Sequence, residues 1–254
     1  MRFKAFTGLS RQSGLGRGLD ALARALPSQC AVCHAWPATR ICTACTARFA
    51  QPVARCTRCA LRVPDGVPVC GACLRSPPVP DRCLAAVDYG YPWSGAVADF
   101  KFRGDPGWAG TLAALMRGAP GVQSALDNAD LVLPIPLSHE RLCERGFNQA
   151  WLLARALSPA TAQAGALVRL HTADAQARLT RAQRLRNLRS AFVVEPALAA
   201  SLRGRHLALI DDVMTTGATM DAAATALREA GCASVVALVL ARTEPGAGTP
   251  MDTP

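Results

Sequence analysis

The sequence has 254 residues, half of them apolar and 18% charged, with a formal net charge of +10. The apolar content suffices for a sizeable core and predicts a globular protein with one medium-sized domain and a small one. No apolar run reaches the ~18 residues that span a bilayer, and the N-terminal region lacks the apolar core of a secretory signal. We therefore expect a cytoplasmic protein without membrane insertion.

The first predicted element is a short helix. Leucines recur at helical spacing over residues 15–26, at Leu15, Leu19, Leu22 and Leu26. This spacing predicts a short amphipathic helix that packs onto the rest of the protein in preference to binding a membrane.

Four pairs of cysteines follow, each with two residues between the thiols. Thiols stay reduced in the cytosol, so eleven cysteines in a chain without an export signal indicate metal ligands rather than disulfides. Two such pairs complete the tetrahedron that zinc prefers, and eight thiolates predict two structural zinc sites. The spacing favours sequential pairing, and a cross-braced arrangement remains open. The predicted ligands are Cys30, Cys33, Cys42, Cys45, Cys56, Cys59, Cys70 and Cys73.

Closed four-thiolate sites leave no coordination position for water, so we expect no metal catalysis there. The zinc instead stabilises a segment with few large apolar residues. Cys83, Cys143 and Cys232 lie outside the pairs. We expect them to be small buried hydrophobic residues.

A proline-rich stretch at residues 77–82 predicts a stiff connector between two domains. Beyond it, apolar runs and amphipathic segments alternate, which predicts an α/β fold with a mostly parallel sheet flanked by helices. The predicted strands are 85–91, 129–136, 166–170, 191–194, 206–212 and 234–242, and the predicted helices are 93–102, 109–118, 148–157, 181–189 and 220–231. In such sheets, ligands bind beyond the carboxyl ends of the strands.

The stretch "LIDDVMTTGATM", residues 209–220, occupies such a strand end. Asp211 and Asp212 can accept hydrogen bonds from vicinal sugar hydroxyls, directly or through a hydrated Mg²⁺. The residues that follow offer hydroxyls and backbone N–H groups at the start of a helix, where an anion is favoured. The lysine of a nucleoside-triphosphate loop is absent. These groups predict a ribose 5-phosphate site, because an ordinary helix cap needs only one hydroxyl. The predicted phosphate-binding residues are Thr215, Thr216, Gly217, Ala218 and Thr219.

Positive charge is concentrated between Arg141 and Arg189, where nine arginines face only Glu144 and Asp174 as acids. Such a segment suits a phosphate-bearing partner, either a small phosphorylated metabolite or nucleic acid. A solvated helix face is the alternative interpretation.

The stretch at residues 209–220 resembles the ribose-phosphate loop of type I phosphoribosyltransferases, which hold 5-phosphoribosyl 1-diphosphate with magnesium. The four cysteine pairs, "KFRGD", "PIPLSHERLCERGFNQAWLLARAL" and "TRAQRLRNLRSAF" resemble, in order, the ComF family, a double zinc ribbon joined to a phosphoribosyltransferase-like domain. The implied organisation is an N-terminal extension at 1–29, a double zinc ribbon at 30–76, a linker at 77–82, a phosphoribosyltransferase-like domain at 83–243 and a disordered tail at 244–254.

By this resemblance, Asp211 and Asp212 would be the catalytic pair that holds the ribose hydroxyls and the magnesium shell, and the threonine-rich turn would bind the 5-phosphate. Weaker candidates for diphosphate contacts are Arg141, Arg145, Asn148, Gln149, Arg181 and Arg189. As an enzyme, the protein would displace diphosphate by a nitrogen nucleophile whose identity the sequence does not assign.

The competing interpretation is a binding module. Members of the resembled family are associated with DNA uptake in natural transformation, which implies single-stranded DNA and competence helicase or DNA-processing proteins as partners. A role in nucleotide metabolism is also implied. Aromatic residues make up only 5% of the chain, which is few for stacking bases.

Overall fold

The structure, a computed structural model, describes residues 28–170 and 191–244. The predicted helices at 15–26 and 181–189 lie outside these residues. The chain divides into two compact units, Met1–Thr46 and Ala47–Pro254. Within the described ranges, no helix is both long enough and apolar enough to cross a bilayer.

In the first unit, the backbone folds around the first two cysteine pairs. Ser28 and Ala38 form an antiparallel bridge with two hydrogen bonds of 2.8 Å. The N–H of His34 donates to the carbonyl of Cys30, which closes the turn between the first two cysteines. Helix α2 (Thr43–Phe49) begins in this unit just after Cys42.

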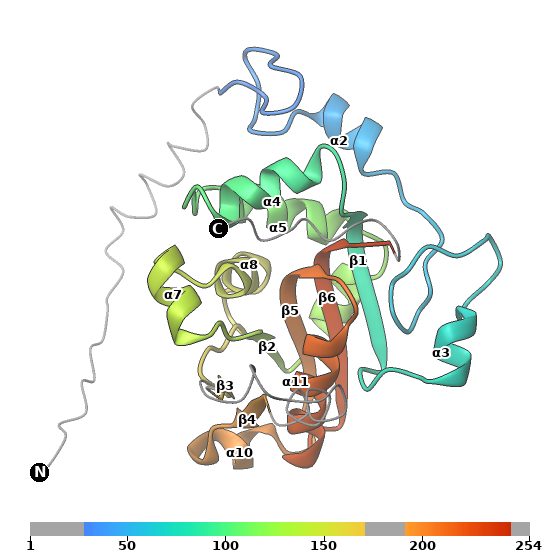
Figure 1. The fold of residues 1–254 in the computed structure, drawn as a ribbon, viewed down its shortest axis with the longest axis vertical. Helices are drawn as coiled ribbons and strands as arrows, with labels where there is room; N and C mark the ends of the chain where they lie inside the picture. The colour runs from blue at the N-terminus through green and yellow to red at the C-terminus, as the bar shows by residue number, and fades with distance from the viewer. Residues whose placement is uncertain (1–27, 171–190, 245–254) are drawn as a thin grey trace, which may run out of the picture. The chain divides into compact units, whose positions relative to one another are not determined.

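Four parallel strands form the sheet of the second unit within the described ranges. Their spatial order is β1 (Arg82–Asp88), β6 (Ser234–Arg242), β5 (His206–Met214) and β2 (Leu131–Pro134). Figure 1 shows β5, β6 and β1 side by side. The predicted α/β fold with a mostly parallel sheet is confirmed. The short strands β3 (Leu167–Arg169) and β4 (Phe192–Val194) pair with each other, antiparallel, in a separate two-stranded sheet.

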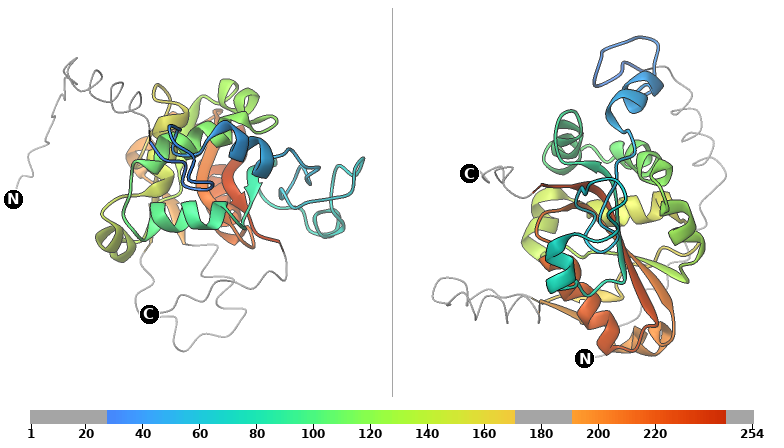
Figure 2. Two further views of the ribbon diagram at one scale, coloured as in Figure 1. Left: turned by 90° about the horizontal axis from the view of Figure 1, so that it is seen from above. Right: turned by 90° about the vertical axis from the view of Figure 1, so that its right-hand side faces the viewer.

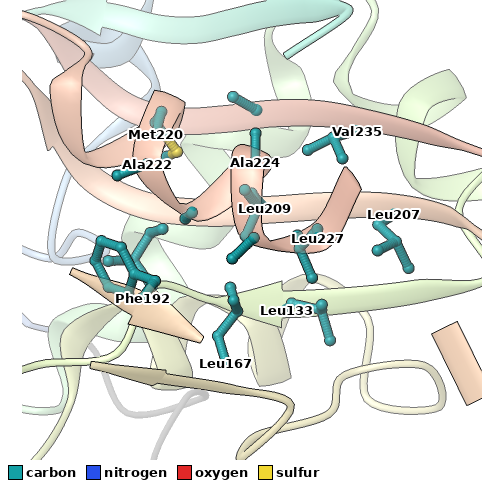
Figure 3. Close-up of a cluster of buried hydrophobic side chains, with 14 of the residues drawn as sticks. Leu133, Leu167, Phe192, Leu207, Leu209, Met220, Ala222, Ala224, Leu227 and Val235 are labelled. Carbon is teal, nitrogen blue, oxygen red and sulfur yellow. The ribbon is translucent and has the colours of Figure 1, made fainter. Parts of the chain in front are cut away.

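One face of the sheet is covered by α11 (Ala218–Glu229). Leu207 and Leu209 of β5 share a buried cluster with Ala224 and Leu227 of this helix, as Figure 3 shows. In Figure 2, α11 lies beside β5 and β6, in the same orange and red part of the chain. The helix therefore lies along the strand whose end carries the acidic pair.

The opposite face carries α4 (Trp93–Lys101), α5 (Trp108–Gly118) and α8 (Gln149–Leu157). Successive side chains of a strand point to opposite faces, and Ala208 and Ile210 of β5 are both fully buried outside the α11 cluster. Helix α8 contacts β5, β2 and α5, and α5 contacts β1, β6 and α4. Because both faces are covered, β5 and β6 are nearly continuous apolar runs.

Four short helices complete the described elements. They are α3 (Gly71–Arg75), α6 (Val122–Asp127), α7 (His139–Arg145) and α10 (Pro196–Leu202). Their five to seven residues contain too few turns for a recognisable apolar period, so the sequence did not predict them.

Other segments cover both edges of the parallel sheet. At β2, Val132 donates to the carbonyl of Thr161 and accepts from the N–H of Gln163, both at 3.0 Å. At β1, the N–H of Cys83 donates to the carbonyl of Thr57 at 3.0 Å. This pairing protects the edge strands and attaches the third cysteine pair to the sheet.

The hairpin of residues 55–62, which contains the third cysteine pair, is also held by charge. Arg55 contacts Asp88 at the end of β1 at 2.7 Å, and Arg62 forms a second ion pair with the same carboxylate. Burial raises the pKa of Asp88, but the two guanidinium groups lower it more, so that its net value lies below the usual range. The carboxylate is therefore ionised at neutral pH and fastens the hairpin to β1.

Candidate functional site

The acidic pair lies near the carboxyl end of β5, which continues two residues further than predicted, to Met214. Asp212 is buried, and its Oδ1 lies 2.9 Å from Nζ of Lys101 at the end of α4. The same oxygen accepts a hydrogen bond of 2.6 Å from the N–H of Val213. Oδ1 of Asp211 accepts from the N–H of Asp212 at 2.9 Å. Backbone and lysine together hold the two carboxylates in place.

The electrostatics of this pair favour a cation. Burial first, and the charge of Asp212 second, raise the pKa of Asp211 to about 7, against the opposing effect of Lys101. Lys101 forms its ion pair with Asp212, so a further cation beside Asp211 would favour ionisation of both carboxylates. Carboxylate oxygens are also the ligands that Mg²⁺ prefers, so this donor set fits a hydrated magnesium ion.

The turn after β5 leads into the N-terminus of α11. Gly217 has φ 87, a left-handed conformation that glycine adopts readily and other residues rarely do. Thr215 and Thr216 are exposed, and Thr219 is partly buried. Oγ1 of Thr216 accepts a hydrogen bond of 3.3 Å from the N–H of Ala218. The first N–H groups of this 12-residue helix, beside three hydroxyls, suit a phosphate group.

A pocket of about 380 Å³ lies beside Lys101 and contains the predicted arginines Arg141 and Arg145. The guanidinium of Arg145 stacks over the ring of Phe102 at 5.3 Å. Lys101 connects the pocket with the acidic pair through its contact with Asp212. The lining residues are Lys101, Phe102, Glu140, Arg141, Glu144 and Arg145.

Asn148 and Gln149 support the start of α8. Oδ1 of Asn148 caps the helix by accepting from the N–H of Trp151 at 3.2 Å, and its Nδ2 donates to the carbonyl of Ile135. Gln149 is buried, and its Oε1 accepts from Arg145 at 3.4 Å. Their predicted contact with diphosphate stays a prediction. Arg181 and Arg189 lie outside the described residues.

Sequence reasoning missed three basic residues of this region, namely Lys101, Arg169 and Arg242. Burial lowers the pKa of Arg169, the charge of Arg141 lowers it further, and the charge of Asp211 raises it, so Arg169 lies within electrostatic reach of both. Lys101 could have been found as one of only two lysines, in "KFRGD". Arg242 could have been found as the charged residue at the end of the otherwise apolar strand β6.

The cysteines form two groups, in which all sulfur atoms lie within 4.8 Å of one another. The first cysteine group is Cys30, Cys33, Cys42 and Cys45, and the second cysteine group is Cys56, Cys59, Cys70 and Cys73. Sequential pairing is therefore confirmed. The sulfur pairs Cys30–Cys45, Cys33–Cys42 and Cys59–Cys70 are separated by 3.9, 3.6 and 3.7 Å. Tetrahedral zinc with ~2.3 Å bonds requires about 3.8 Å between sulfurs, so both groups fit zinc.

The thiols of each group differ in acidity. Burial raises the pKa of Cys30 and Cys56, but backbone N–H groups outweigh it and bring the values to about 6 and about 7. For Cys45, burial and the neighbouring thiols raise the pKa to about 12. For Cys59, burial together with Cys56 and Cys70 outweighs the lowering effect of the Leu61 N–H and of Cys73, and the pKa rises to about 11. Because adjacent thiolates repel one another, a cation between them would favour ionisation of the whole group.

The three cysteines outside the groups differ in burial, and one of them departs from the prediction. Cys83 and Cys232 are buried, as expected. Cys143 is exposed, and the expectation of burial was wrong, because it lies in α7, a short helix without buried residues.

Comparison with known sequences agrees with this geometry. Residues 152–252 match the phosphoribosyl transferase domain family. The DNA utilization protein YhgH of Salmonella typhimurium (strain LT2) is 32% identical over 213 residues, with 80% of this chain and 90% of the relative covered. Competence protein F of Haemophilus influenzae is 33% identical over 183 residues, covering 68% and 78%. Competence protein ComFC of Bacillus subtilis is 37% identical over 147 residues, covering 57% of each.

Among solved structures, the chain is similar to a glutamine phosphoribosylpyrophosphate amidotransferase from B. subtilis, with 17% identity and a TM-score of 0.37. The match covers 56% of this chain and 30% of that enzyme. A second match, an allosteric regulatory enzyme of purine biosynthesis, has 19% identity and a TM-score of 0.36, over 52% of this chain and 25% of the other.

Proposed function

Because this chain belongs to the ComF/YhgH competence protein family, we propose that its phosphoribosyltransferase domain binds 5-phosphoribosyl 1-diphosphate with Mg²⁺ and transfers the ribosyl phosphate. One observation carries the proposal. Three features lie next to one another at the carboxyl end of β5: the acidic pair, the threonine turn and, through the contact of Lys101 with Asp212, the basic pocket. Each suits one part of that ligand.

The turn of residues 215–219 would bind the 5-phosphate through N–H groups at the start of α11 and through its hydroxyls. Asp211 and Asp212 would accept hydrogen bonds from the ribose hydroxyls. Bound Mg²⁺ would offset the charge of the carboxylates and of the diphosphate oxygens.

The diphosphate would occupy the basic pocket, beside Lys101, Arg141 and Arg145. In the transfer, the bond from ribose C1 to the diphosphate oxygen breaks and a bond from C1 to an acceptor nitrogen forms. The bonding electrons leave with diphosphate, which the three cations stabilise, and the acceptor nitrogen gives up a proton to solvent. The carboxylates stabilise the positive charge that develops on the ribose ring.

The two cysteine groups would each hold one structural zinc ion. Their four thiolates fill a tetrahedral shell, so this metal would stabilise the fold and take no part in transfer. The proposed boundaries remain a zinc ribbon at 30–76 and a ligand-binding domain at 83–243.

Calorimetric titration of the whole protein with 5-phosphoribosyl 1-diphosphate tests the proposal. We expect binding with Mg²⁺ that weakens at least tenfold when Mg²⁺ is left out of a chelator-free buffer, because the ion offsets the negative charge of both the acidic pair and the diphosphate. Ribose 5-phosphate is the matched control ligand and should bind more weakly, since it leaves the basic pocket empty. Equal affinity for both ligands, or no binding, would refute the assignment. Release of diphosphate with a panel of amines and bases then reveals turnover and the acceptor.

A second candidate function is binding of single-stranded DNA, since relatives carry the names DNA utilization protein and competence protein. The arginine-rich segment of the sequence supports it. Affinity for an oligonucleotide should then fall steeply with salt. Neutralising Arg181, Arg184 and Arg186 should reduce the slope by about 2, at ~0.7 per phosphate contact. A salt-insensitive interaction would leave only the metabolite function.

A further inference from the structure

Arg242 is the last residue of β6 and is almost completely buried, with 4% of its surface exposed. Its hydrogen bonds in the described structure all go to backbone carbonyls. A guanidinium removed from water needs several such acceptors with good geometry. Movement of any one of these carbonyls would therefore leave the charged group without one of its hydrogen-bond partners.

These carbonyls belong to two functional parts of the molecule. On one side, Nε donates to the carbonyl of Cys59 at 2.9 Å. On the other side, Nη1 donates to the carbonyl of Met214 at 3.0 Å and to that of Thr215, where the phosphate turn begins. One side chain thus joins a ligand of the second cysteine group to the base of the turn.

The turn end of this connection is reinforced by the next residue. The N–H and Oγ1 of Thr243 both donate to the carbonyl of Met214, at 3.1 and 3.2 Å. Nη1 of Arg242 also donates to the carbonyl of Thr243 at 2.7 Å. The backbone from which the turn starts is therefore held from β6.

The cysteine end of this connection lies within the second cysteine group, at Cys59. The flanks of the hairpin are attached to β1 independently, through Arg55, Arg62 and Thr57, but Cys59 lies in the turn between them. The next residue, Ala60, has φ 59, a left-handed conformation that persists in a non-glycine residue only when its surroundings impose it. The N–H of Ala60 donates to the carbonyl of Cys56 at 2.8 Å, so this conformation closes the turn that carries the thiols of Cys56 and Cys59.

We propose that Arg242 is a positioning residue through which the second cysteine group, with its metal, sets the conformation of the phosphate-binding turn at residues 215–217. Metal in that group then controls ligand affinity without touching the ligand. This inference rests on the proposed function for the identity of the ligand, but the turn conformation can be measured without one.

The first measurement is amide hydrogen exchange of the full-length, zinc-loaded protein without ligand. Arg242→Met should speed exchange in peptides spanning residues 213–219 by about tenfold, the equivalent of one hydrogen bond to a charged group. Zinc content should remain at two ions per chain. Cys70→Ser, which opens the second cysteine group, should speed exchange in the same peptides and lose one zinc. Cys33→Ser opens the first cysteine group and is the matched control, because its loss of one zinc should leave these peptides unchanged.

The second measurement is the affinity for 5-phosphoribosyl 1-diphosphate with Mg²⁺. Arg242→Met and Cys70→Ser should each lower it about tenfold, and the double variant should be little worse than either single one. Arg242→Lys keeps the charge but cannot reach both sets of carbonyls, so it should resemble Arg242→Met and replaces it if that variant does not fold.

The outcomes separate the two proposals. Unchanged exchange and affinity in the Arg242 variants, or fully additive losses in the double variant, would overturn the coupling while ligand binding by the parent protein stands. If the parent protein does not bind 5-phosphoribosyl 1-diphosphate but the variants still speed exchange, the coupling stands and the proposed function fails.

Discussion

Asp211→Asn is expected to lower the affinity for 5-phosphoribosyl 1-diphosphate with Mg²⁺ by about ten- to a hundredfold, the value of one hydrogen bond to a charged group. The substitution keeps the shape of the side chain and removes the charge that would hold the ribose hydroxyls and the magnesium shell. Because Asp211 adjoins Asp212 and lies near Lys101, it acts within one charge cluster. Calorimetric titration measures the loss.

Asp99→Asn is the matched control for this substitution. Asp99 lies on α4 and pairs with the exposed Arg103 at 2.9 Å, so the same chemical change should leave affinity unaltered. Asp212→Asn should also weaken binding, and it removes the ion-pair partner of Lys101. Parent-like affinity in both Asp211→Asn and Asp212→Asn would remove the acidic pair from the site.

Cys73→Ser is expected to reduce the zinc content from two ions to one per chain and to destabilise the second unit. A structural zinc site contributes roughly 10–16 kcal/mol of binding free energy, so loss of the ion should cost at least about 4 kcal/mol. For a domain of this size that lowers the melting temperature by at least about 10 °C. Metal analysis and thermal unfolding at fixed protein concentration measure both effects.

Cys143→Ser serves as its control, because Cys143 is exposed and belongs to neither cysteine group. Two zinc ions and an unchanged melting temperature are expected there. If Cys73→Ser also retains two zinc ions, the second cysteine group does not bind metal as proposed.

Local patterns predicted several features correctly because their causes are local. The two-residue spacing of each cysteine pair allows both sulfurs to face one ion, and the sequential pairing follows from short connections. Long apolar runs such as 234–242 became buried parallel strands with the predicted bounds. The strand and helix around "LIDDVMTTGATM" were also predicted, but β5 ends two residues later, and α11 begins and ends two residues earlier, than expected.

Contacts between distant segments could not be predicted in this way. Lys101 and Asp212 are separated by more than a hundred residues, and they meet because α4 ends beside the carboxyl end of β5. The same holds for Arg169, whose neighbours Arg141 and Asp211 come from other elements. No spacing rule connects such residues, so the basic half of the site was only partly foreseen.

The amino-acid sequence by itself determined the α/β fold class, the two cysteine groups and the acidic, threonine-rich strand end, since each depends on periodicity or spacing within a short window. Only the tertiary structure decided that β3 and β4 pair apart from the parallel sheet, that Lys101 partners Asp212, and that Arg242 joins Cys59 to the turn. The physical reason is that burial and hydrogen bonding of these groups depend on which strands become neighbours, and strand order is settled by packing of the whole chain.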